Sequence, residues 1–220
     1  MQRHVDAELV ELREALLRMG SLAETAIGQA MKALTSRNAE LARSVISSDD
    51  VINMAEVEVD ERCLRMLALH QPEAGDLRFI AMALKINSDL ERMGDMAVNI
   101  AERTVDLLKE PLLKPLIDLP RMAELAQAMV RDSLDAFLRR DAALAREVCR
   151  RDSQVDQIND QIFRELLTYM LQDAKSIERA VGLILVGRHL ERIADHATNI
   201  AEDVVYLVEG KTIKHHLAGE

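Results

Sequence analysis

Residues that break helices or crosslink small folds are scarce in this sequence. Its 220 residues include 8 glycines, 4 prolines, 2 cysteines and no tryptophan, and aromatic residues make up only 2%. Two isolated cysteines exclude a disulfide framework and favour reduced thiols in a cytosolic protein. Because glycine and proline are rare while alanine, leucine, glutamate, arginine and methionine are abundant, the composition is typical of an all-α protein.

Long apolar runs and clustered basic residues are missing as well. No apolar stretch approaches the roughly 18 residues of a membrane span, and the N-terminal residues lack a signal-peptide pattern. The net charge of −10 argues against a nucleic-acid surface, because phosphate backbones are bound by clustered lysine and arginine. An acidic chain better suits cations or protein partners. We therefore expect a cytoplasmic protein that reaches a membrane only through its partners.

A polar pattern occurs twice, one hundred residues apart. Residues 91–102 read ERMGDMAVNIAE and residues 191–202 read ERIADHATNIAE, with eight of the twelve positions identical. Five of these eight are charged or amide residues, and such a polar pattern rarely recurs by chance. A second similarity, between residues 38–45 and 141–148, has an offset of 103. The three-residue difference falls in the turn at Pro72, where a change of length costs little, so the chain is predicted to contain one unit twice.

The apolar residues of each unit recur every three or four positions, which predicts three helices per unit. We predict an all-α fold of two tandem antiparallel three-helix bundles, six helices in all. The proline-rich residues 111–120 form the predicted linker between a first repeat (1–110) and a second repeat (121–210), followed by a tail (211–220). Asn38 and Asp141 are predicted N-caps, and Gly210 is predicted to end the last helix. The first helix is predicted from Val5 to just before Asn38, and the others over about 39–68, 76–109, 121–140, 142–171 and 175–208.

The repeated segment places its polar residues on one side of a helix. At 100° per residue, Glu91, Asp95, Asn99 and Glu102 fall within about 80° of one another, and apolar neighbours such as Met93 fall on another side. The polar stripe is therefore separate from the core-facing side. The second copy repeats the stripe with Glu191, Asp195, Asn199 and Glu202.

The preceding helix of each unit carries matching polar residues. Asp49 and Asn53 lie as far before the turn at Pro72 as Asp95 and Glu91 lie after it. In an antiparallel hairpin, Asp49 should therefore face Asp95, and Asn53 should face Glu91. The second unit repeats this arrangement around its turn at 173–174, with Asp152 opposite Asp195 and Asp156 opposite Glu191.

Carboxylates that face one another in this way suggest bound cations. Close like charges repel, and either protonation or a cation must relieve the repulsion. Oxygen-rich sites suit divalent or transition metal ions such as Mg, Mn, Fe or Zn, and helical bundles can hold several of them. Two alternatives stay open: a solvated acidic face with local Glu–Arg pairs, or residues that have not diverged since duplication. The predicted metal ligands are Asp49, Asn53, Glu91, Asp95, Asn99, Glu102, Asp152, Asp156, Glu191, Asp195, Asn199 and Glu202.

At these residues the sequence resembles the PhoU family of phosphate-signalling regulators. The acidic motif that this family repeats falls on Glu91 and Asp95 and again on Glu191 and Asp195. One departure is Ala194, which stands where the family usually has glycine before the second aspartate. With the internal repeat, the resemblance covers nearly the whole chain. The matching segments are residues 56–78, 85–102, 163–173 and 188–210.

The resemblance implies two tandem three-helix bundles with metal sites on their surface, for which iron or zinc are the reported occupants in some members. It implies a cytoplasmic protein, often a homodimer, that negatively regulates phosphate uptake and phosphate-starvation signalling. The expected partners are the ATPase subunit of the phosphate transporter and a membrane sensor histidine kinase. No catalytic activity is expected from such a regulatory adaptor.

Two other functions remain as alternatives. A multinuclear carboxylate site could serve a metal-dependent enzyme, although di-iron bundles carry Glu-x-x-His pairs that point into the core, and this chain has none. A structural helical protein without metal is the third possibility. His196 is not counted as a ligand, because it lies about 100° away from its neighbour Asp195 on a helix.

Overall fold

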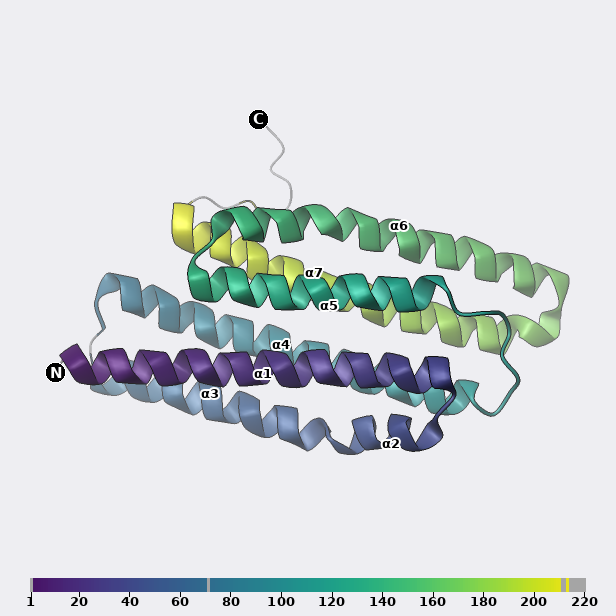
Figure 1. The fold of residues 1–220 in the computed structure, drawn as a ribbon, viewed down its shortest axis with the longest axis horizontal. Helices are drawn as coiled ribbons and strands as arrows, with labels where there is room; N and C mark the ends of the chain where they lie inside the picture. The colour runs from purple at the N-terminus through teal and green to yellow at the C-terminus, as the bar shows by residue number, and fades with distance from the viewer. Residues whose placement is uncertain (1, 71, 211–212, 214–220) are drawn as a thin grey trace.

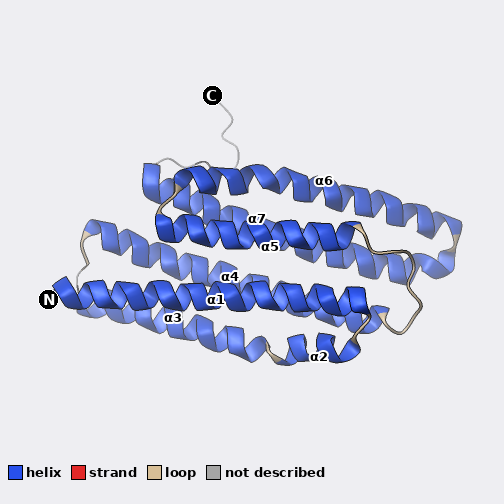
Figure 2. Ribbon diagram, viewed as in Figure 1, coloured by secondary structure: helices blue, strands red, loops and turns tan. Residues whose placement is uncertain are grey.

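The computed structural model describes residues 2–70, 72–210 and 213, and these residues form helices without any strand (Figures 1 and 2). A short 3₁₀ turn, η1 (Ala174–Ser176), precedes the last helix. None of the described helices combines the length and apolar character needed to cross a bilayer. The helices are α1 (Gln2–Ser36), α2 (Ala39–Ser47), α3 (Asp49–Leu69), α4 (Ala74–Leu107), α5 (Asp118–Arg139), α6 (Ala142–Gln172) and α7 (Ile177–Glu209).

The ends of these helices follow from local sequence signals. The side chain of Asn38 accepts a hydrogen bond from the backbone N–H of Leu41 at 3.0 Å, and Asp141 accepts one from Leu144 at 3.0 Å. Both residues satisfy an N–H that has no partner within the helix, so the two predicted N-caps are confirmed. Gly210 ends α7 with a φ of 69°, a left-handed conformation that glycine adopts without strain.

The second predicted helix is interrupted at Ser48, so that α2 and α3 together take its place. The N–H of Ser48 is shared between the carbonyl oxygens of Ser44 and Val45, both at 3.1 Å. Its hydroxyl donates to the Val45 carbonyl at 2.9 Å, a side-chain contact that competes with regular helix. The equivalent residue of the second repeat is Arg151, which lies inside the continuous α6 and bonds to Asp132 of α5 at 2.5 Å.

The remaining boundaries differ from the predicted ones by a few residues. α5 begins at Asp118, inside the predicted linker 111–120. Pro120 lies in the first turn of this helix, where its missing N–H costs no hydrogen bond. The predicted tail 211–220 lies outside the described residues except for Ile213.

The helices form two antiparallel three-helix bundles, one from α1 to α4 and one from α5 to α7, which confirms the predicted fold class (Figure 1). The buried positions of α1 recur in α5 at an offset of 103, from Leu16 and Leu119 through Leu34 and Phe137. The bundles are joined by α1 with α5 and by α4 with α7. Phe79 of α4 stacks on Phe137 at 4.8 Å between ring centroids, so one hydrophobic core runs through both repeats.

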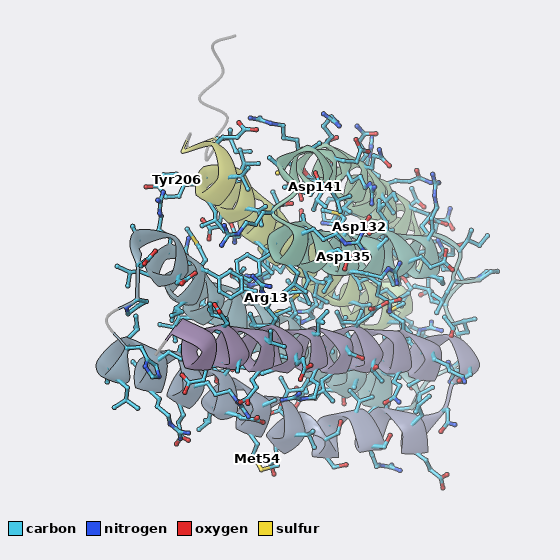
Figure 3. All side chains as sticks on the ribbon, turned by 60° about the vertical axis from the view of Figure 1, so that its left-hand side comes forward. Arg13, Met54, Asp132, Asp135, Asp141 and Tyr206 are labelled. Carbon is cyan, nitrogen blue, oxygen red and sulfur yellow. The ribbon has the colours of Figure 1, made fainter. Side chains whose placement is uncertain are left out.

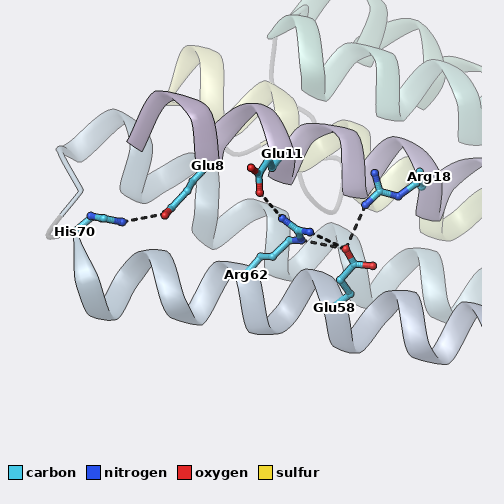
Figure 4. Close-up of polar contacts among 6 residues, drawn as sticks. All are labelled: Glu8, Glu11, Arg18, Glu58, Arg62 and His70. Carbon is cyan, nitrogen blue, oxygen red and sulfur yellow. Dashed lines mark hydrogen bonds and ion pairs between the residues drawn. The ribbon is translucent and has the colours of Figure 1, made fainter. Parts of the chain in front are cut away.

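Ion pairs at the surface link α1 and α3 (Figure 4). Arg62 reaches Glu11 at 2.7 Å and Glu58 at 2.9 Å, and Glu58 also meets Arg18 at 3.3 Å. These side chains are partly exposed, so each pair adds no more than about 1 kcal/mol. Met54 projects from the outer side of α3 and is 65% exposed (Figure 3). The side of α3 that faces the core buries Ile52, Val59, Cys63 and Met66, and the helix packs against both α1 and α4.

Candidate metal centre

In the first repeat, the break at Ser48 places Asp49 at the beginning of α3. One turn later, Asn53 donates a hydrogen bond from its Nδ2 to the Oδ2 of Asp49 at 3.0 Å. The other carboxylate oxygen of Asp49, Oδ1, is buried and has no hydrogen-bond partner. A buried carboxylate oxygen without a donor is costly, so this oxygen is available to a donor or a cation.

Glu91 and Asp95 of α4 lie close to Asp49, as the hairpin spacing predicted. Partial burial raises the pKa of Asp95, and the carboxylate of Asp49 raises it further. Partial burial also raises the pKa of Glu91, and both aspartates add to this effect. Like charges raise one another's pKa only at short range, so α3 and α4 bring these three carboxylates together.

Glu56 is a further member of this group that the sequence reasoning missed. Partial burial raises its pKa, as do the nearby carboxylates of Asp60 and Asp95. Glu56 lies seven residues, or two helical turns, after Asp49, and this spacing could have drawn attention to it. It escaped notice because the second repeat has Asn159 at the equivalent position, so the internal repeat gave no signal.

The second repeat brings its four carboxylates together between α6 and α7. Asp152 accepts a hydrogen bond from the Thr198 hydroxyl at 3.2 Å. Asp195 is an exposed residue. Desolvation by nearby protein atoms, and then the charges of Asp152 and Glu191, raise its pKa to about 6. Burial also raises the pKa of Asp156, with Asp152 and Glu191 as the nearest charged contributors. The predicted opposition of these helices is therefore observed in both repeats.

The outer half of each predicted stripe is less involved. In the part of the chain described, Asn99 and Glu102 form no side-chain hydrogen bond or ion pair, and Asn199 forms none either. Glu202 lies near Cys149, whose pKa is raised to about 11 by burial first and by the Glu202 charge second. These four residues lie one or two turns farther along their helices than the inner carboxylates, and their part in a metal site stays a prediction.

No three His, Cys, Asp or Glu side chains among the described residues converge closely enough to hold a metal ion. The carboxylates of each repeat are neighbours, but their oxygens do not share one centre as the side chains lie. His196 points away from the stripe, as expected, and its Nδ1 lies 2.9 Å from Asp89 in the contact between α4 and α7.

The packing beneath the stripe accounts for the departure at Ala194. In the first repeat, a Cβ added to Gly94 would lie 2.9 Å from Cδ1 of Ile52 on α3. The second repeat has Val155 at the position of Ile52 and Ala194 at the position of Gly94. Because valine is one carbon smaller, it leaves room for the alanine methyl group. The two helices can thus approach closely in both repeats. The first repeat combines a larger side chain with glycine, and the second combines a smaller side chain with alanine.

Two separate parts of the chain, residues 16–104 and 119–204, match the family model described as the PhoU domain. The chain belongs to the PhoU family. The two matches correspond to the two bundles, so the internal repeat is a repeat of the PhoU domain. A protein of Aquifex aeolicus, the "Phosphate-specific transport system accessory protein PhoU homolog", is 50% identical over 208 residues, which cover 94% of each chain. A Pseudomonas putida protein of the same name is 42% identical and covers 98% of this chain and 84% of its own length.

Solved PhoU structures have the same arrangement. The crystal structure of PhoU from Pseudomonas aeruginosa matches with a TM-score of 0.90 and 43% identity, over 94% of this chain and 99% of that one. The phosphate transport system regulatory protein PhoU from Streptococcus pneumoniae matches with a TM-score of 0.88 and 34% identity, over 96% and 99%. The order and packing of the helices are therefore those of the PhoU fold.

Proposed function

We propose that this PhoU-family chain is a cytoplasmic regulatory adaptor that negatively regulates phosphate uptake and phosphate-starvation signalling. The observation that carries the proposal is the match over 94% of its length to a relative named as an accessory protein of phosphate-specific transport. The proposed partners are the ATPase subunit of the phosphate transporter and a sensor histidine kinase, and the proposed assembly is a homodimer.

The partner proposal is tested by measuring binding of the purified chain to the transporter ATPase subunit encoded in the same genome. Biolayer interferometry with the immobilised ATPase gives the dissociation constant, and a helical protein of similar net charge serves as the control. Saturable binding of this chain alone supports the adaptor. Absence of binding, together with turnover of a phosphoester or of oxygen, rejects the adaptor in favour of a metal-dependent enzyme.

We also propose that the inner carboxylates of each repeat bind divalent or transition metal ions such as Mg, Mn, Fe or Zn. The support is chemical: the donors are oxygens, their charges repel one another, and the buried Oδ1 of Asp49 has no partner. Rotation of the side chains would bring the oxygens to a common centre. Asp49, Glu91 and Asp95 would hold the ion in the first repeat, and Asp152, Asp156, Glu191 and Asp195 would hold it in the second.

Metal binding is tested by elemental analysis of protein purified without chelator and by titration of chelated protein with Mn²⁺ or Zn²⁺. The double variant Asp49→Asn/Asp95→Asn should lose one of two classes of site. Asp50→Asn is the matched control, because Asp50 is an exposed carboxylate next to Asp49 that belongs to neither group. Equal metal content in the parent and the double variant would reject the first site, and a metal-free parent that also fails to bind added ions would reject both.

A further inference from the structure

The contact between α4 and α7 contains buried charged residues that the proposed function does not use. At one end of this contact, Nζ of Lys85 lies 2.5 Å from Oδ2 of Asp203, and Nδ1 of His196 lies 2.9 Å from Oδ1 of Asp89. Asp203 is 3% exposed, and Asp89 and His196 are 9% exposed. These pairs join the two repeats, since Lys85 and Asp89 belong to the first and Asp203 and His196 to the second.

The internal repeat relates each of these residues to a different one at the other end of the contact. The equivalents of Asp89 and His196 are His189 and Met96, which meet through His189 Nδ1 and the Met96 sulfur at 3.4 Å. The equivalents of Lys85 and Asp203 are Leu185 and Arg103. Arg103 pairs instead with an aspartate of its own helix, at 3.4 Å. Within the described chain, no ion pair joins α4 and α7 at this second end.

The second end also contains a cavity. About 440 Å³ of space lies between the C-terminal part of α4 and the N-terminal part of α7. Leu107 rests on Gly182 there, so close that a Cβ on the glycine would lie 2.8 Å from Leu107 Cδ2. Arg103, Arg179 and Leu185 are among the other residues around this space. At one end of the contact between the repeats, Lys85, which is half exposed, and His196 reach the buried carboxylates of Asp203 and Asp89, and the other end borders open space.

We infer that the two repeats pivot about the end that contains Lys85, Asp89, His196 and Asp203, and that the contact opens at the end that contains Arg103 and Leu185. Separating the helices at the first end would take Lys85 away from the buried carboxylate of Asp203 and His196 away from that of Asp89, which is strongly unfavourable. Separation at the second end would break the hydrogen bond from Arg179 to the Pro111 carbonyl at 3.2 Å, but no ion pair between the described residues of α4 and α7, and it widens a space that already borders solvent. This inference does not depend on the proposed function.

The pivot would change the distance between the two carboxylate groups. Glu91 and Asp95 are carried by α4, and Glu191 and Asp195 by α7. Because each helix moves as a rigid body, a rotation between them changes the relative position of the two stripes without altering either bundle. The contact between α4 and α7 is thus a conformational element through which one repeat can influence the other.

Two symmetry-related pairs of spin labels test this inference on the full chain by double electron–electron resonance. The first pair, Ala81→Cys/Tyr206→Cys, spans the joined end, and Tyr206 lies on the outer side of α7 (Figure 3). The second pair, Asp106→Cys/Val181→Cys, spans the end with the cavity, and all four positions are exposed. The native thiols should react little at neutral pH, because burial raises the pKa of Cys63 to about 12 and that of Cys149 to about 11.

We expect a broader distance distribution, extending to longer distances, for the pair at the cavity than for the pair at the joined end. Two variants, Lys85→Leu and His196→Met, introduce at the joined end the residue types found at the equivalent positions of the other end. A third variant, Asp89→Asn, removes a charge while keeping the shape of the side chain. Each should broaden the distribution for the 81/206 pair, and circular dichroism would establish that the helices are retained. Equal widths for the two pairs in the parent chain, or a folded variant set that leaves the 81/206 distribution unchanged, would overturn the inference.

Discussion

The two repeats carry the same acidic stripe on differently supported helices. In the first repeat, the helix breaks at Ser48, and Asp49 keeps one buried oxygen without a partner. In the second, Arg151 occupies the position of Ser48 and anchors a continuous helix, while Thr198 donates a hydrogen bond to Asp152. The comparison teaches that the duplicated feature is the placement of the carboxylates, and that each repeat reaches it with its own packing and hydrogen bonds.

The repeats also differ in where their charges lie. Asp156 stands where the first repeat has Asn53, so the second hairpin opposes carboxylates at both heights. Desolvation, and then the charges of the neighbouring carboxylates, raise the pKa of Asp195 to about 6. The amide in the first repeat instead donates a hydrogen bond to Asp49, which removes one charge and supports another. Each repeat thus has four neighbouring carboxylates, but the first carries Glu56 where the second has Asn159.

The largest expected effect comes from exchanging the packing beneath the stripes. Gly94→Ala should destabilise the protein by about 1–2 kcal/mol, because the new methyl group would overlap Ile52 and this outweighs the gain in helix propensity. The double variant Gly94→Ala/Ile52→Val copies Ala194 and Val155 and should recover the parent stability or exceed it. Urea denaturation of the parent, both single variants and the double variant gives the coupling between the two positions.

A suitable control for this cycle is Ala194→Gly in the second repeat. This variant loses a methyl group and a good helix former, so it should be destabilised by about 1 kcal/mol without any overlap to relieve. If the effects of the substitutions at residues 52 and 94 on the free energy of unfolding are additive, the two positions are not coupled, and the proposed compensation between their side-chain volumes is wrong.

A smaller effect is expected from Arg151→Ser, which makes the second repeat resemble the break of the first. Arg151 loses its 2.5 Å contact with Asp132, and the side chains of this pair are only 23% and 28% exposed. Partial burial makes the pair stronger than a fully exposed one, so we expect a loss of about 1 kcal/mol. Amide hydrogen exchange should then increase in α6 around residue 151, and an unchanged exchange rate there would contradict the anchoring role.

The smallest effect concerns charge and depends on pH. A carboxyl group whose pKa is raised in the folded state favours folding at low pH, and this contribution is lost as the pH rises through about 6. Asp195→Asn should therefore raise the melting temperature of chelated protein at pH 8 but not near pH 4. The gain should stay below about 1 kcal/mol, because solvent reaches this side chain. Asp50→Asn corrects for net charge, and an equal gain for both variants would show that crowding at Asp195 is not its cause.

Most of the fold could be predicted because it depends on local signals. The N-caps at Asn38 and Asp141 and the repeated polar segment fixed the helices and their pairing, and counting from the turns placed Asp49 opposite Asp95. The break at Ser48 was missed, because serine hydroxyls and shared N–H groups interrupt a helix without disturbing its hydrophobic period.

The candidate site was predicted in part. The repeat identified the inner carboxylates as neighbours, whereas the part of Asn99 and Glu102 stays a prediction, because helical angle alone does not register distance along the helix axis. Glu56 was overlooked because the second repeat lacks an acid there. The partners of His196 and Asp203 could not be foreseen, since the sequence gives no register for the contact between α4 and α7.

The stacking of Phe79 on Phe137 has a consequence for the origin of the molecule. These rings come from different repeats and are only 1% and 0% exposed, so neither bundle covers its own apolar surface. A single-repeat ancestor would have needed a second copy of itself to shield that surface from water. Fusion of two such copies would turn an association that depends on protein concentration into a covalent one, and would leave each half free to acquire its own charges.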